Sequence, residues 1–465
     1  MKKVIFLFFI IFVLTGINAK EKTYTISMLG SNIGESIEKW KKYNDISGKC
    51  VLQLEAVSTM DIARGGHSLS MKTKSLLKAN CHDLFPISIE SESSETGSEM
   101  NSKAEVQNNF FKGEIVKNNI KETTTFPVPA GTVFFGMIFK KLSENDLLKG
   151  GAIQVISEES LALKTVSYQA VKESTGLLKA TVNYEGIVLV FFLKKDLVVR
   201  SELQGGLVSY QLKEHQFPTE NRQKAPFQST KGDILTGTSI LNRGIRVRNP
   251  RETNKMSFTV SGSHISEIPE TCFQKKMGGS NSIAVDNAPA FCNSPPALQD
   301  TQGNIFEDSN NIKIITTAQK ITQGAPNKNE KIKRLTNFVF NHIKNKNYNH
   351  GNLSASETLE KKAGDCTEHA TLLSALLKSV GIPTKMAYGI VLDNNGKFMF
   401  HNWNEVYGDF GWMTVDSTFK SSKADAARIL LAYGGNDSSA REQVSLAVIK
   451  FLNSFEISVT GFSNE

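Results

Sequence analysis

The sequence lacks a hydrophobic run long enough for a membrane helix, since its longest apolar stretch, Val4–Leu14, has 11 residues and a span needs about 20. It also lacks a concentrated basic stripe: 54 Lys and Arg against 46 Asp and Glu leave a net charge of +8 over 465 residues. So mild a charge is not typical of a nucleic-acid-binding protein. The sequence therefore argues against a multi-pass membrane protein and gives no sign of nucleic acid as a partner.

The rest of the composition is that of an ordinary globular protein. Apolar residues make up 40% of the chain and charged residues 22%, which is neither the disordered nor the fibrous profile. At this length, two or three domains are expected.

The N-terminus has the pattern of a Sec-type signal peptide. Two lysines precede the apolar stretch, and the small residue Ala19 follows it, which predicts a signal peptide over residues 1–19, cleaved after Ala19. An uncleaved anchor is the alternative, but 11 helical residues extend only about 16 Å, roughly half of the hydrocarbon thickness. We therefore expect a periplasmic or secreted protein with no transmembrane span after cleavage.

Cysteines are few, and their number is odd. Exported proteins normally pair their cysteines, and among five the economical pairing is Cys50–Cys81 and Cys272–Cys292. Cys366 is then left as a free and reactive thiol. Sequence alone does not fix the connectivity, and five unpaired, buried cysteines are the alternative.

The first half of the chain has the pattern of strands. Apolar and polar residues alternate in Thr23–Leu29, the period of a half-buried strand. Three further runs separated by short polar breaks predict an antiparallel meander: Ile187–Leu193, Leu197–Leu203 and Leu207–Leu212. Another strand is expected at Asn254–Val260. The acidic, Ser-rich segment Glu90–Lys103 predicts a mobile loop.

The second half changes in character. Residues 274–311 are rich in Gly, Asn, Ser and Pro, as expected of a linker. Helices are predicted within Asn329–Asn345, after the capping box that begins at Ser354, and over Thr367–Val380. Strands are expected near Lys385–Leu392, Phe398–Tyr407 and Trp412–Asp416. The predicted fold class is thus α+β: an antiparallel β-rich domain at 20–273, the linker, an α+β core at 312–433 and a C-terminal extension at 434–465.

Three residues of the α+β core carry candidate chemistry. Cys366 begins the predicted helix, where the helix dipole and unpaired N–H groups favour a thiolate. If Gly408–Asp409 is the loop of a two-residue hairpin, His401 lies directly opposite Asp416. An imidazole that takes the thiol proton and a carboxylate that orients it would complete a catalytic triad.

Each of these residues also has an ordinary structural interpretation. A single Cys before an apolar helix is more often part of a core, and a His beside aromatic residues is more often a packing residue. A four-residue loop, Gly408–Gly411, would instead place Asp416 opposite Trp403. The Cys366-x-x-His369 pair suggests metal, but a zinc site needs three or four ligands, so no metal and no cofactor is expected.

Four blocks in order resemble the transglutaminase-like superfamily: Gly364–Ala370, Gly381–Pro383, His401–Tyr407 and Gly411–Thr418. The resemblance covers about Asn329–Tyr433. It implies a papain-like fold, with Cys366, His401 and Asp416 as nucleophile, base and orienting carboxylate. Within the same blocks, it marks supporting positions at Trp403, Glu405 and Trp412.

The resemblance implies an exported thiol enzyme that acts on amide or peptide carbonyls through an acyl-enzyme. The acyl group would pass to water, as in a peptidase or amidase, or to an amine. Expected substrates are a protein, a peptide or the peptide of peptidoglycan. The alternative is a catalytically inert binding or scaffold protein of the cell envelope.

Overall fold

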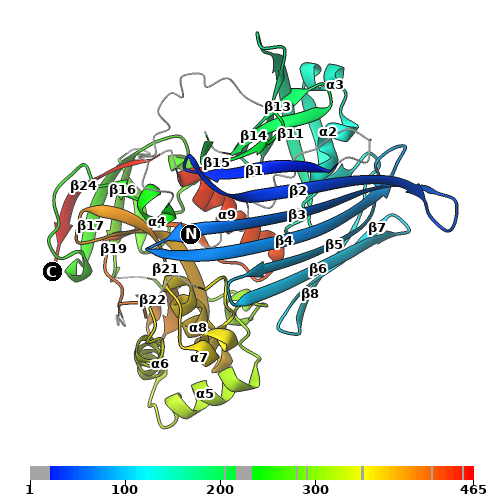
Figure 1. Ribbon diagram of the computed structural model, residues 1–465. Coiled ribbons are helices and arrows are strands. Elements are labelled where there is room, and N and C mark those ends of the chain that lie inside the picture. The colour runs from blue at the N-terminus through cyan, green and yellow to red at the C-terminus, as the bar shows by residue number, and fades with distance from the viewer. Residues whose placement is uncertain are drawn as a thin grey trace. The chain divides into compact units, whose positions relative to one another are not determined.

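The computed structural model describes residues 21–203, 206–215, 233–278, 281–289, 292–346, 350–419, 423–452 and 455–464. The chain divides into two compact units (Figure 1), of which the N-terminal unit ends at Gly237 and the C-terminal unit begins at Thr238. The predicted signal peptide lies outside the described residues. No helix within these ranges is long and apolar enough to cross a membrane.

The N-terminal unit is built around one sheet of 15 strands. Strands β1–β8 follow one another across the sheet, and β9–β15 follow in the other direction, because β1 pairs with both β2 and β15. The strands are β1 (Lys22–Met28), β2 (Ser31–Asn44), β3 (Cys50–Arg64), β4 (His67–Asn80), β5 (Pro86–Glu95), β6 (Ser98–Gln107), β7 (Phe110–Lys117), β8 (Ile120–Pro127), β9 (Val133–Phe134), β10 (Gly151–Ile156), β11 (Leu163–Lys172), β12 (Leu178–Tyr184), β13 (Ile187–Lys194), β14 (Leu197–Leu203) and β15 (Val208–Leu212).

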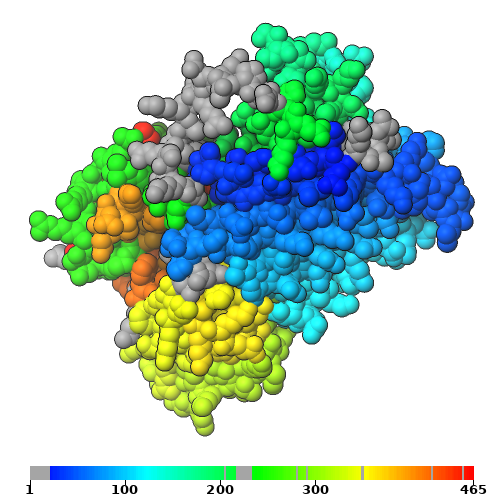
Figure 2. Space-filling view, viewed as in Figure 1, coloured from blue at the N-terminus to red at the C-terminus, as the bar shows by residue number. Residues whose placement is uncertain are grey.

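Alternation of apolar and polar residues explains most of this sheet. On β1, Tyr24, Ile26 and Met28 are fully buried, because successive side chains of a strand point to opposite faces. The predicted meander is confirmed as β13, β14 and β15 with antiparallel pairing. Figure 2 shows strands of the first half of this sheet at the surface, in blue and cyan. The short helices of the unit are η2 (Phe135–Met137), α2 (Ile138–Lys141), α3 (Glu144–Lys149) and α4 (Ile234–Gly237).

The loop predicted over Glu90–Lys103 is wrong. This segment forms most of the hairpin β5–β6, which turns at Thr96–Gly97, where Gly97 has a φ of 79°. The two strands pair with β4 and β7 on their other sides. Backbone hydrogen bonds on both sides thus stabilise a segment whose polar side chains gave no strand signal, since the ladder does not depend on side-chain identity.

The C-terminal unit holds two smaller sheets and the main helices. Its strands are β16 (Ile240–Leu241), β17 (Lys255–Ser261), β18 (Gln274–Met277), β19 (Ser282–Asp286), β20 (Thr384–Leu392), β21 (Lys397–Gly408), β22 (Gly411–Val415), β23 (Arg428–Tyr433) and β24 (Glu456–Ser463). Its helices are η4 (Pro250–Glu252), η5 (Ile265–Glu267), η6 (Leu298–Thr301), α5 (Ile312–Thr322), α6 (Lys328–His342), α7 (Ala355–Lys361), α8 (Cys366–Ser379) and α9 (Ser438–Phe451).

The segment predicted to be a linker contains regular structure. Strands β18 and β19 lie within residues 274–311 and join β17 and β24 in a four-stranded sheet. The predicted C-terminal extension supplies the edge strand β24 of the same sheet. The boundary between the compact units, at Gly237, therefore differs from the boundary at residue 273 that composition indicated. Gly- and Asn-rich turns between short strands produce the same composition as a linker.

Helix α8 forms the centre of the α+β core. Leu373 and Leu376 are fully buried and pack with residues of α5, α6 and α7 in one cluster, which also contains Val406 of β21 and Val415 of β22. The predicted helices are confirmed as α6, α7 and α8, and Ser354 caps α7 with the expected capping box. The three predicted strands are confirmed as β20, β21 and β22.

Candidate active site

The thiol of Cys366 lies at the first residue of α8. The Asp365 side chain caps the helix by accepting from Thr367 N at 2.8 Å, and Glu368 Oε2 accepts from Asp365 N at 3.0 Å. A Cβ on Gly364 would lie 2.4 Å from Glu368 Cβ, so glycine permits this tight entry into the helix. Cys366 is partly exposed and unpaired, which leaves its sulfur accessible at the helix N-terminus.

The other four cysteines form two disulfides. Cys50 pairs with Cys81, and Cys272 pairs with Cys292, each with a Cα–Cα distance of 5.5 Å. These are the pairings that the cysteine positions favoured. Cys366 is thus the unpaired cysteine of the chain.

His401 lies in the middle of β21 and faces Asp416. Its Nε2 is 2.8 Å from Asp416 Oδ2, and both side chains are buried. Burial alone would lower the pKa of His401, but the charges of Asp416 and Cys366 and hydrogen bonds to both outweigh it and raise the pKa to about 9. Because Nε2 bonds to Asp416, Nδ1 is the nitrogen left for the sulfur.

The register predicted for the β21–β22 hairpin is wrong. Tyr407 pairs with Trp412 and Gly408 with Gly411, so the loop is the four-residue alternative, Gly408–Gly411, which places Asp416 opposite Trp403. The register places Asp416 past the end of β22 and two residues out of line with His401. The carboxylate nevertheless reaches the imidazole. Proximity of the two groups was predicted, but the register offered as its reason was not the one observed.

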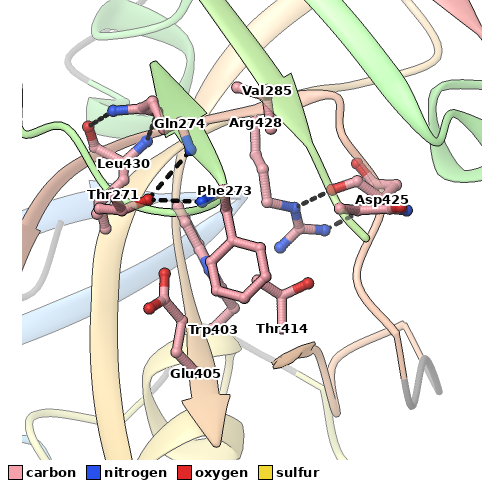
Figure 3. A pocket seen from close by; sticks show the side chains of 11 residues that line it. Thr271, Phe273, Gln274, Val285, Trp403, Glu405, Thr414, Asp425, Arg428 and Leu430 are labelled. Atoms are coloured by element: carbon pink, nitrogen blue, oxygen red, sulfur yellow. Dashed lines mark hydrogen bonds and ion pairs between the residues drawn. The ribbon is translucent and has the colours of Figure 1, made fainter. Parts of the chain in front are cut away.

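A buried arginine explains where the Asp416 side chain points. Arg428 Nη1 donates to Asp416 Oδ2 at 3.1 Å, and Arg428 Nη2 donates to Asp425 Oδ2 at 2.6 Å (Figure 3 shows Arg428 beside Asp425). Burial alone would raise the pKa of Asp416, but His401 and Arg428 lower it well below its usual range. Asp416 is therefore held as a carboxylate between two cationic groups.

A second arginine extends this cluster to Phe419, whose ring stacks on His401. Arg251 Nη1 donates to Asp425 Oδ2 at 2.6 Å, and its guanidinium lies 4.8 Å from the Phe419 ring centre. Phe419 in turn stacks on the His401 ring at 5.1 Å. Sequence reasoning missed Arg251, Asp425 and Arg428. Arg428 lies three residues after Asp425 and 12 after Asp416. Arg251 lies 174 residues before Asp425, so the contact of Arg251 is the one that joins distant segments.

The three supporting residues have different surroundings. Trp403 stacks near His401 with ring centres 6.4 Å apart. Glu405 accepts from Tyr433 Oη at 2.7 Å, and burial raises its pKa to about 7. Trp412 points elsewhere: its Nε1 donates to Ser294 O at 2.9 Å, and its ring packs beside the Cys272–Cys292 disulfide. Trp403 is thus the one of the three whose ring contacts a triad side chain.

His369 does not complete a metal site in this structure. Its Nδ1 lies 2.7 Å from Asp365 O, and burial lowers its pKa to about 4. Among the described residues, the group spaced for a metal is Cys50, Cys81 and His82, but its two cysteines form a disulfide.

The comparison with protein families agrees with the residue pattern. Residues 315–417 match the profile of the transglutaminase-like superfamily. Solved structures that resemble the chain include a candidate cysteine protease from Cytophaga hutchinsonii (14% identity, 45% of this chain and 86% of that one, TM-score 0.29). A candidate protease from Parabacteroides distasonis also matches (12% identity, 83% and 70%, TM-score 0.21). No curated protein matches the chain.

The family match falls within the C-terminal unit. Residues 315–417, which match the transglutaminase-like superfamily, contain Cys366, His401 and Asp416. A third solved structure, a domain of unknown function from Brucella abortus, matches 42% of this chain and 94% of its own at 11% identity and a TM-score of 0.29.

Proposed function

We propose that the protein is an exported thiol enzyme that cleaves amide or peptide bonds through an acyl-enzyme on Cys366. The observation that carries this proposal is the hydrogen bond between His401 and Asp416 beside the free thiol at the start of α8. The superfamily match of residues 315–417 supports the same chemistry. The disulfides support an oxidising compartment.

The reaction starts from a thiolate–imidazolium pair. The Cys366 sulfur attacks the carbonyl carbon, and His401 gives its proton to the nitrogen as the carbon–nitrogen bond breaks. The amine leaves, and the acyl group stays on sulfur as a thioester. Water, deprotonated by His401, then attacks the thioester and releases the acid and the thiol. An amine in place of water gives acyl transfer.

Asp416 orients the imidazole and stabilises its charged form. Because His401 is buried, an uncompensated imidazolium would be costly there, and the carboxylate at 2.8 Å offsets that cost. Arg428 keeps this carboxylate ionised and aimed at Nε2. Asp416 and Arg428 thus act as positioning groups behind the reacting atoms.

The oxyanion that forms on the carbonyl oxygen needs a donor. The N–H of Cys366 is one of the first N–H groups of α8, which have no acceptor within the helix. It points outward at the positive end of the helix dipole. We assign it to the oxyanion hole.

Trapping the acyl group tests the proposal. The mature protein would be incubated separately with a glutamine-containing peptide, a peptide amide and a peptidoglycan stem peptide, quenched in acid and analysed by intact mass. We expect a mass increase equal to the acyl group on Cys366, absent from Cys366→Ala. Absence of adduct and of product with every substrate, in a protein whose Cys366 also resists iodoacetamide, would contradict an enzyme and favour a binding protein.

A further inference from the structure

A small cavity lies beside Trp403 and the buried Arg428–Asp425 pair (Figure 3). It leaves about 20 Å³ for the centres of water-sized molecules, and one water needs roughly 10–15 Å³ by that measure. The space is therefore large enough for one or two waters and too small for an organic ligand. It is lined by Thr271, Phe273, Gln274, Val285, Asn287, Trp403, Glu405, Thr414, Asp425, Arg428 and Leu430.

Three polar atoms of the cavity wall have no protein partner. They are Trp403 Nε1, Asn287 Oδ1 and Thr414 Oγ1, on side chains that are 2%, 6% and 4% exposed. The Asn287 amide is held in this orientation because its Nδ2 lies near three acceptors, at 3.0–3.4 Å. Buried polar groups are nearly always hydrogen-bonded, so a ligand with both donor and acceptor capacity fits this wall.

The charges around the cavity favour a neutral ligand. Arg428 is already paired with Asp416 and Asp425, and its guanidinium would repel a cation. Glu405 would repel an anion when ionised. A water molecule accepts one hydrogen bond from the indole, donates one to the amide oxygen and exchanges either kind with the hydroxyl.

We propose that this cavity binds one or two ordered water molecules, which bridge Trp403, Asn287 and Thr414 and hold the Trp403 ring against His401. The Trp403 ring lies beside both the His401 ring and the Arg428 guanidinium. Its ring is nearly parallel to that of His401, at 17°, and the Arg428 guanidinium lies 5.0 Å from its centre.

Trp403 is tightly packed except where it borders the cavity. A Cβ on Gly389 would lie 2.7 Å from the tip of the indole, so the strand β20 closes one side, while the cavity lies on another. On the side of the cavity, a bound water molecule holds the indole N–H through a hydrogen bond. Trp403 is therefore a positioning residue; this part of the inference depends on the proposed function, whereas the water site does not.

Crystallography and NMR test the water site independently of activity. In a crystal structure at about 1.5 Å resolution we expect one or two ordered peaks within hydrogen-bond distance of Trp403 Nε1. The chain has three tryptophans, so the indole N–H of Trp403 can be assigned with Trp403→Phe, and it should show a cross-peak to a long-lived water. If the side chains around the cavity are well ordered but neither a water peak nor the cross-peak is observed, the proposed water site is wrong.

A matched pair of variants tests the bridging role. Thr414→Val removes the hydroxyl at nearly constant volume, and Thr259→Val does the same at an exposed position of β17. We expect Thr414→Val alone to lose a water peak and to weaken the cross-peak of the Trp403 indole. If Thr414→Val keeps the same water peaks and cross-peak as Thr259→Val, the bridge as proposed is wrong.

Activity then separates the water site from the reaction. With a substrate that acylates Cys366, Thr414→Val should lower kcat more than it changes KM, because the ring position affects proton transfer rather than binding. Thr414→Ser, which restores the hydroxyl, should recover kcat. Equal kcat in all three proteins would overturn the positioning role. An inactive wild-type protein with an occupied cavity would instead count against the proposed function alone.

Discussion

Two ion pairs, one in each compact unit, differ in how far they are buried. In the N-terminal unit, ion pairs such as Lys74–Glu55 lie on the surface, with side chains 52% and 35% exposed. In the C-terminal unit, Arg428 and Asp425 pair at 4% and 3% exposure, directly beside the triad. Water screens the first kind of pair and not the second. The difference shows where a charge change should matter: at the buried pair near the triad it should affect both stability and chemistry, and at the exposed pair on the large sheet neither.

The largest expected effect is the loss of activity when Asp416 is replaced. Asp416→Asn removes the charge that stabilises the imidazolium, so kcat should fall by about 10³–10⁴-fold, as is usual for the orienting residue of a triad. Asp409→Asn is the matched control in the same hairpin. Its carboxylate accepts from the N–H groups of Lys328 and Asn329 at the start of α6, and asparagine keeps one acceptor, so activity should stay within about twofold.

The pH profile adds a second measure to this comparison. In the wild-type protein, hydrolysis should decline as pH rises through about 9, where His401 loses its proton. Asp416→Asn removes the main charge that raises the pKa of His401, so this decline should move to lower pH. An unchanged profile with nearly full activity would show that Asp416 does not belong to the catalytic machinery.

The prediction for Asp416 also shows how much of the site could be predicted from the sequence alone. The start of α8, its capping residues and the helical and strand periods are local, and they placed Cys366 and His401 correctly on their elements. The register of β21 on β22 depended on turn chemistry: the sequence favoured the two-residue loop Gly408–Asp409, whereas the structure has the alternative loop, Gly408–Gly411. Asp416 reaches His401 because Arg428 holds it, and that contact has no local signal.

Removing the buried arginine should cost the most stability. Arg428→Met keeps a long side chain but leaves Asp416 and Asp425 buried with less compensation, so the free energy of unfolding should fall by about 3–5 kcal/mol. Lys74→Met, on the exposed pair of β3 and β4, should cost less than about 1 kcal/mol. Urea denaturation of both variants measures the difference.

The comparison between the units fails if these two variants are alike. A loss below about 1 kcal/mol for Arg428→Met would mean that water reaches the buried pair and screens it. Arg428→Lys separates charge from geometry: it keeps the positive charge but lacks the planar fork that contacts both carboxylates. We expect it to recover part of the stability and little of the activity.

Removing either disulfide should lower stability by a similar amount, but only the loss of Cys272–Cys292 should affect the active site. Cys50–Cys81 and Cys272–Cys292 close loops with sequence separations of 31 and 20, each expected to contribute about 3 kcal/mol through chain entropy. Replacing either pair with serine should therefore lower stability by a similar amount. Loss of Cys272–Cys292 should also slow iodoacetamide labelling of Cys366, because that disulfide packs against Trp412 of the triad sheet. Equal labelling in both double variants would show that the disulfide does not support the site.

The smallest expected effect concerns a buried acid of the C-terminal unit. Burial raises the pKa of Glu405 from an ordinary 4.5 to about 7, so between these values the folded state holds a proton that the unfolded state has lost. Stability therefore falls as pH rises through this window. Glu405→Gln cannot ionise and still accepts from Tyr433. It should match the wild-type protein at pH 4 and be more stable by up to about 3 kcal/mol at pH 8.

An exposed glutamate of the N-terminal unit provides the control for this window. Glu90 lies on the exposed face of β5, so Glu90→Gln should leave stability unchanged at both pH values. Thermal melts of the two variants at pH 4 and pH 8 give four melting temperatures. Only that of Glu405→Gln at pH 8 is expected to differ from the wild-type value. If Glu405→Gln is not stabilised at pH 8, Glu405 is compensated when ionised, and Lys385, whose charge lowers its pKa, is the group that would do so. Glu405→Gln in a Lys385→Met background would then be stabilised at pH 8, and the contrast between a buried and a hydrated carboxylate would reduce to the presence of one lysine.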